Sequence, residues 1–149
     1  MKNLYEPSTV VEVRERMNAL RPDSEQVWGR MNAAQMLAHC SVSMEGAVGD
    51  RRPPRIFIGR LLGPFAKPDF LDENPMKHNS PTGKSFVITD ERDFVAERER
   101  LLGLIDRFAA ARPGGCTKHP HSFFGVLTPE EWARGMYKHL DHHLRQFGA

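Results

Sequence analysis

The sequence has few of the features that mark membrane proteins, disulfide-stabilised proteins or strongly charged proteins. No apolar run reaches the roughly 18 residues that a membrane span needs, and the first residues lack the long apolar segment of a signal peptide. Its 2 cysteines, Cys40 and Cys116, form no C-x-x-C motif and no disulfide framework, so we expect reduced thiols. The net charge of +2 gives no electrostatic indication of a nucleic-acid partner.

Length and composition indicate one globular domain over residues 1–149, because 40% hydrophobic residues are enough to form a core. We expect a cytoplasmic protein that acts on a small molecule, with no nucleic-acid partner and no membrane partner. The sequence does not decide whether the protein forms a homodimer.

Helix signals occur in four places. The first helix is predicted to begin at Ser8 or Thr9, with Thr9 and Glu12 as a capping box. The second is predicted to begin at Asn32, with Gln35 completing another capping box. Residues 31–44 contain no Asp, Glu, Lys or Arg, which is typical of a helix buried on most sides.

The third helix is predicted from about Thr89 or Asp90 to Ala111. The fourth has the clearest start, with Thr128 as cap, Pro129 at the first helical position and Glu131 closing a capping box. Together the four segments predict an all-α four-helix bundle.

Residues 49–85 form the least regular segment, with six of the 11 prolines. We expect a long crossover between the second and third helices, which could cover the mouth of a site and select the substrate. A short apolar helix over residues 56–62 and a short strand over residues 86–89 are options that the pattern does not decide.

Two histidines of the last helix are candidate metal ligands. His139 and His143 stand four residues apart, so their rings project from one face one turn apart. That face is otherwise apolar, and Lys138, Asp141 and Arg145 are expected on the opposite, solvent side. A buried imidazole needs partners for both nitrogens, and a metal ion is one such partner.

A third ligand is expected from another inner helix, and His39 is the candidate within the uncharged second helix. Periodicity does not show which way His39 faces. Hydrogen-bonded core histidines are commoner than ligands, so a structural role stays open for all three. His142 is either a neighbour that supports the ligands or a solvated side chain. For His78, His119 and His121 we favour a structural role.

Several runs resemble the DinB/YfiT-like superfamily and, within it, an uncharacterised bacterial domain-of-unknown-function family. Residues 28–40 (WGRMNAAQMLAHC) resemble the second helix of the superfamily, and residues 137–148 (YKHLDHHLRQFG) resemble its last helix. Residues 79–81 and 123–132 are further features shared with the narrower family. The likeness covers nearly the whole chain.

The resemblance implies a four-helix bundle with a long connection between helices two and three, and a metal held by one histidine of the second helix and two of the last. Carried over by position, the ligands are His39, His139 and His143. Superfamily members with known activity use such a metal, often zinc, with low-molecular-weight thiols such as bacillithiol, mycothiol or glutathione. The resemblance to the narrower family implies no particular activity.

Three histidines would leave an open metal position, which is typical of catalytic sites. A bound metal could activate water, giving a hydrolase, or hold a thiolate, giving a thiol transferase. No acid is obviously placed as a general base; Glu45 and Asp50, just after the second helix, are candidates near one end of the bundle. Zinc is the favoured metal, with nickel, iron or copper as options. The alternative is a non-enzymatic bundle, dimeric or not, that binds a metal or a small ligand.

Overall fold

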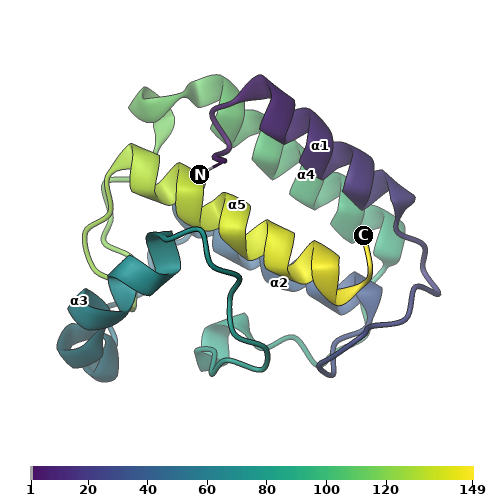
Figure 1. Cartoon of the computed structure of the whole chain (residues 1–149), viewed down its shortest axis with the longest axis horizontal. Helices are drawn as coiled ribbons and strands as arrows, with labels where there is room; N and C mark the ends of the chain where they lie inside the picture. The colour runs from purple at the N-terminus through teal and green to yellow at the C-terminus, as the bar shows by residue number, and fades with distance from the viewer. Residues whose placement is uncertain (1) are drawn as a thin grey trace.

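The computed structural model describes residues 2–149, and over those residues the protein is all-helical, with five α-helices and no strand. The helices are α1 (Pro7–Ala19), α2 (Ala33–Val48), α3 (Phe57–Leu71), α4 (Phe94–Ala111) and α5 (Pro129–Gln146), with short 3-10 turns η1 (Lys84–Phe86) and η2 (Pro113–Gly115) (Figure 1). The all-helical prediction is confirmed, and there is one helix more than predicted.

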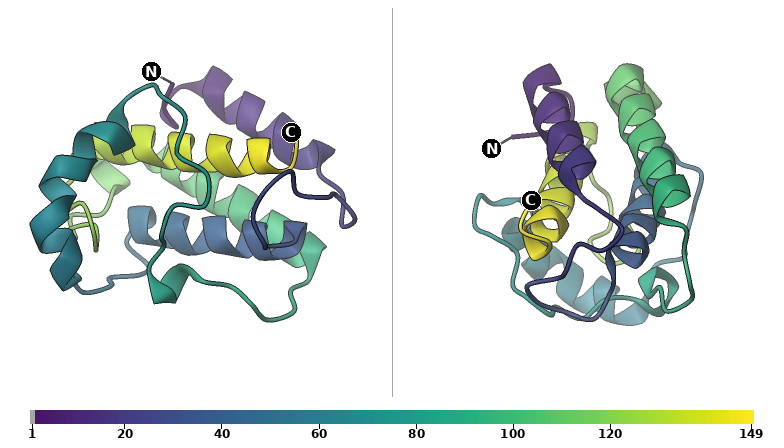
Figure 2. Two further views of the ribbon diagram at one scale, coloured as in Figure 1. Left: turned by 60° about the horizontal axis from the view of Figure 1, so that its bottom comes forward. Right: turned by 90° about the vertical axis from the view of Figure 1, so that its right-hand side faces the viewer.

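Four of the helices surround the core. α2 packs on α4 and α5, and α1 packs on the same two helices (Figure 2). The side chains between them are apolar and fully buried, among them Met17, Leu37, Leu101, Ile105 and Leu140. Cys40 and Cys116 are free and buried, as expected from the sequence. α3 contacts α5 and stands at one end of the molecule (Figure 1).

The predicted starts of the second and fourth helices are confirmed. The Asn32 side chain accepts a hydrogen bond from the backbone N–H of Gln35, whose own side chain accepts from the N–H of Asn32. Thr128 and Glu131 make the same reciprocal pair at α5. Each pair satisfies backbone donors that the first turn leaves unpaired.

The first helix begins earlier than predicted, and the Thr9–Glu12 capping box is wrong. α1 starts at Pro7, a residue favoured in the first turn because its missing N–H would have no partner there. Thr9 is buried inside the helix, and its hydroxyl donates to the Glu6 carboxylate. α4 also starts later than expected, after Asp93, whose side chain accepts from the N–H of Ala96.

The crossover over residues 49–85 is more regular than predicted, because α3 has 15 residues and continues through Pro64 and Pro68. Both prolines are exposed and four residues apart. The carbonyls deprived of a helical donor therefore lie on the outer side of the helix, where water can reach them. Residues 86–89 form no strand; the 3-10 turn η1 ends at Phe86.

Lys138 is buried, against the prediction that it lies on the solvent side of the last helix. Its ammonium donates to the Asp72 carboxylate at 2.6 Å and to the carbonyl oxygens of Asp69 and Asp72. This contact fixes the end of α3 to the middle of α5. Asp141 and Arg145 pair at the surface as predicted. None of the helices in residues 2–149 is long and apolar enough to cross a membrane.

Candidate metal centre

Three histidines meet between α2 and α5. His39 lies in the middle of α2, and His139 and His143 lie one turn apart on α5. One nitrogen from each ring lies within 4.8 Å of the other two, a spacing that can hold a metal ion. The structure therefore brings together the three residues that the sequence singled out, and His39 faces α5, which periodicity alone did not show.

Hydrogen bonds hold two of the three rings with Nε2 free to coordinate. The carbonyl oxygen of Phe86 lies 2.7 Å from Nδ1 of His39, and Oε1 of Gln146 lies 2.8 Å from Nδ1 of His143. An oxygen acceptor requires the proton on Nδ1, so a neutral ring presents the lone pair of Nε2. Partners of this kind, behind the coordinating nitrogen, are typical of metal-bound histidines.

The third ring completes the arrangement. Nε2 of His139 lies 3.0 Å from Nε2 of His39. Without a metal, the His139 N–H would donate to the His39 lone pair. A tetrahedral zinc ion with Zn–N bonds of about 2.0–2.1 Å separates two ligand nitrogens by roughly 3.3 Å. The pair therefore needs only a slight opening to bind zinc.

Electrostatics favour the neutral, metal-binding form of all three rings. Burial lowers the pKa of His39, and burial with the neighbouring imidazoles lowers the pKa of His139 well below its usual range. Burial, then the nearby His39, lowers the pKa of His143 to about 3. At neutral pH the rings are uncharged, so a metal need not displace protons from imidazolium groups.

The cluster has access to solvent on one side. His39 and His143 are buried, whereas His139 is half-buried. Within the described residues no cysteine, carboxylate or fourth histidine joins the group. Three protein ligands with an accessible side are typical of catalytic rather than structural zinc sites.

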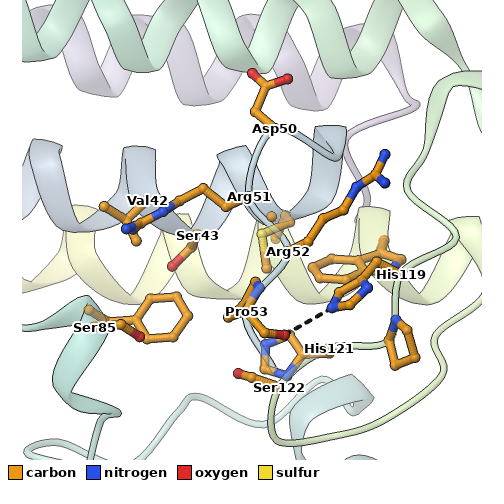
Figure 3. Close-up of a pocket in the computed structure, with 15 residues that line it drawn as sticks. Val42, Ser43, Asp50, Arg51, Arg52, Pro53, Ser85, His119, His121 and Ser122 are labelled. Carbon is orange, nitrogen blue, oxygen red and sulfur yellow. Dashed lines mark hydrogen bonds between the residues drawn. The ribbon is translucent and has the colours of Figure 1, made fainter. Parts of the chain in front are cut away.

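Figure 3 shows a cavity of about 370 Å³ whose lining begins one helical turn from the cluster. Val42 and Ser43 line it one turn beyond His39 on α2, and Met136 lines it one turn before His139 on α5. Phe86 also lines it, and its carbonyl is the acceptor for His39. Residues 50–53 and 85–86 contribute to the wall of this cavity.

The remaining predicted residues lie around this centre. His142 is not one of the three grouped histidines; its ring centroid is 5.0 Å from that of His143 and 5.6 Å from that of Trp28. His78 stacks on Trp28 at 3.7 Å. The Nε2–H of His119 donates to the carbonyl of Pro53. These contacts give His78 and His119 structural roles.

Neither predicted general base is free to act as one. The Glu45 carboxylate pairs with Arg100 of α4. Asp50 lines the cavity, but the Arg107 guanidinium holds its carboxylate and lowers its pKa. A carboxylate paired with an arginine is a weak proton acceptor, so this prediction finds no support.

Sequence reasoning missed two supporting groups. Gln146 follows His143 by three residues on the same helical face, a signal that could have identified it. The amide of Gln146 in turn donates to the carbonyl of Trp28 at 2.7 Å. The Phe86 carbonyl comes from a segment 47 positions away from His39, and no local pattern predicts that contact.

Comparison with known proteins identifies the family but no activity. The chain belongs to the family described as Protein of unknown function (DUF1569), whose model matches residues 6–149. No curated protein and no solved structure matches the chain.

Proposed function

We propose that this protein is a metal-dependent enzyme of the thiol-transferase or hydrolase type, built on a DinB/YfiT-like four-helix bundle of α1, α2, α4 and α5. The observation that carries the proposal is the convergence of His39, His139 and His143 on one point with an accessible side. The ligands, the long connection after α2 and the last helix agree with the resemblance of residues 28–40 and 137–148 to that superfamily.

The residues have separate tasks in this proposal. His39, His139 and His143 hold a divalent metal, for which zinc is favoured and nickel or iron are options. Phe86 and Gln146 keep the protons of His39 and His143 on Nδ1, away from the metal. When bound, the metal supplies a lowered pKa for water, or for a thiol from a low-molecular-weight cofactor.

The adjoining cavity supplies the place for a substrate. Its walls start one turn from two of the ligands, so a molecule bound there would lie close to the cluster. No carboxylate in it is free to act as a base, because Asp50 is paired with Arg107. This favours a reaction in which the metal-bound group itself is the nucleophile.

The test is metal content measured on protein purified without a histidine tag. We expect about one zinc ion per chain after loading and dialysis, and a higher melting temperature than after chelation. His139→Ala should lose the metal, whereas the matched variant His142→Ala should keep it. Equal loss in both variants, or no stoichiometric metal in the parent protein, would overturn the proposal.

The alternative function is a non-enzymatic metal-binding or ligand-binding bundle. A homodimer stays part of this alternative, because α3 exposes three large apolar side chains four residues apart, Phe57, Leu61 and Phe65. A loaded protein whose metal shows no exchangeable water would favour it, since a catalytic site keeps an open position.

A further inference from the structure

The cavity beside the histidine cluster contains a hydrogen-bond donor whose proton position is fixed by the backbone. Nδ1 of His121 accepts from the N–H groups of Phe123 and Phe124, both at 3.1 Å. The proton of the neutral ring must therefore be on Nε2. His121 lines the cavity (Figure 3), and its Nε2–H meets no acceptor among residues 2–149.

A second donor lies on the same wall. Trp132 is 3% exposed, and its indole Nε1–H is buried without a partner in the described part of the chain. Its ring centroid is 5.4 Å from that of His121. A buried N–H without an acceptor costs about 1–3 kcal/mol. The Nε1 atom itself is closed to a water-sized molecule, so a ligand in the cavity contacts the Trp132 ring rather than its N–H.

The charged side chains that line the cavity carry a positive excess, two arginines against one aspartate. Arg51 and Arg52 line it and extend to opposite sides (Figure 3). Arg51 is 3.9 Å from Glu45, and Arg52 makes no ion pair within the described residues. Asp50, the acidic residue of the lining, is neutralised by Arg107. The field at the cavity therefore favours an anion.

The lining also has a large apolar part beside its serines and histidines. Val42, Pro53, Phe86, Pro120 and Met136 surround the space together with the Trp132 ring. A volume of about 370 Å³ lies in the range of sites for small molecules. Inorganic anions would leave these walls without contacts, so the lining fits an organic body with an acidic end.

We propose that this cavity binds a small organic carboxylate, whose oxygens accept from Nε2–H of His121 and whose apolar body lies against Phe86, Trp132 and Met136. The claim that such a carboxylate is the substrate of an enzyme rests on the proposed function. The claim that the cavity binds a carboxylate does not, because none of the contacts involves a metal.

The experiment follows the two indole N–H resonances of ¹⁵N-labelled protein during titration with 3-phenylpropionate, with the uncharged 3-phenylpropan-1-ol as matched probe. Trp28 is the internal control, because it stacks on His78 away from this cavity. The carboxylate should shift the Trp132 resonance and leave that of Trp28 in place. The alcohol cannot form the charge-assisted hydrogen bond, so we expect its affinity to be lower by about tenfold or more.

The variant His121→Asn tests the donor. Its side-chain oxygen can accept from the turn N–H groups as Nδ1 does, while the Nε2–H is lost. We expect the affinity for 3-phenylpropionate to fall by about tenfold or more. His119→Asn is the matched control, since the Nε2–H of His119 is already used by Pro53. If His121→Asn fails to fold, Trp132→Phe followed by calorimetry tests the contact between the ligand body and the Trp132 ring.

All titrations are repeated with zinc-loaded and with chelated protein, which separates the two proposals. Binding that persists after chelation supports this site, whether or not zinc binds. Binding that requires zinc and ignores His121→Asn would mean direct coordination and would overturn it. Equal affinity for the alcohol, or no shift of the Trp132 resonance, would also overturn it and leave the metal proposal to its own test.

Discussion

The side-chain oxygen of Gln146 lies 2.8 Å from Nδ1 of His143, and the same side chain donates to the carbonyl of Trp28. The second bond fixes which end of the amide faces the ring. Gly29 has a φ of +86°, and a Cβ there would lie 2.3 Å from the Gln146 amide nitrogen. The tight Trp28–Gly29 turn therefore orients a metal ligand through one intermediate side chain.

Gln146→Leu should weaken zinc binding by about 10–100-fold, the usual effect of removing such a supporting hydrogen bond. Gln146→Glu keeps an acceptor for Nδ1–H and should retain most of the affinity. Competition with a chromogenic chelator measures both. Gly29→Ala should behave like Gln146→Leu, because it displaces the same amide; an unchanged zinc affinity in both would show that Gln146 does not position His143.

The stability of the metal-free protein should fall with acid. Burial, then the nearby Arg55, lowers the pKa of His121 from 6.5 to about 4, and that of His143 falls to about 3. Below about pH 6.5 the histidines of the unfolded chain take up protons, while the two native rings stay neutral. The stability that these neutral rings contribute is therefore present above pH 6.5 and is lost as the pH falls towards 4 and 3.

For His121 alone, the shift from 6.5 to about 4 corresponds to about 3 kcal/mol of unfolding free energy. Urea unfolding of chelated protein at a series of pH values between 7 and 4 measures the loss. His121→Asn, which has no titrating ring, should show a smaller loss over this range. Identical pH profiles for the parent and the variant would contradict the burial of a neutral His121.

α3 holds the loop that carries His121. A Cβ at Gly63 would lie 2.2 Å from the Phe123 carbonyl oxygen, so Gly63→Ala must push helix and loop apart. We expect about 1–3 kcal/mol of destabilisation and weaker binding in the cavity. The matched variant Gly103→Ala, at an exposed position of α4, meets nothing within 4 Å and should stabilise by about 0.5–1 kcal/mol. Thermal melts distinguish the two.

Sequence patterns predicted the features that depend on interactions within one or two helical turns. The capping pairs Asn32–Gln35 and Thr128–Glu131 stand where expected, because each satisfies backbone groups within one turn. α3 was missed beyond residue 62 because Pro64 and Pro68 normally end helices. Both prolines lie on the exposed side, where water can reach the carbonyls that lose a helical donor, and the sequence pattern does not show which side of a helix they occupy.

The candidate site also has a part that the sequence predicted and a part that it did not. Helical spacing placed His139 and His143 on one face, and the structure puts both rings there. The orientation of His39 was undecided because α2 is buried on most of its sides, so its apolar pattern has no outward face. His121 was assigned a structural role because its cavity forms only when α2, η1 and α5 meet, which no local pattern shows.

The most direct test of the central claim is anomalous diffraction from zinc-loaded crystals, with data collected on both sides of the zinc edge. We expect one strong anomalous peak bounded by the Nε2 atoms of His39, His139 and His143, with a non-protein ligand at the remaining position. A peak elsewhere, for example between His78 and His142, or no peak at all from protein crystallised with excess zinc, would contradict the account.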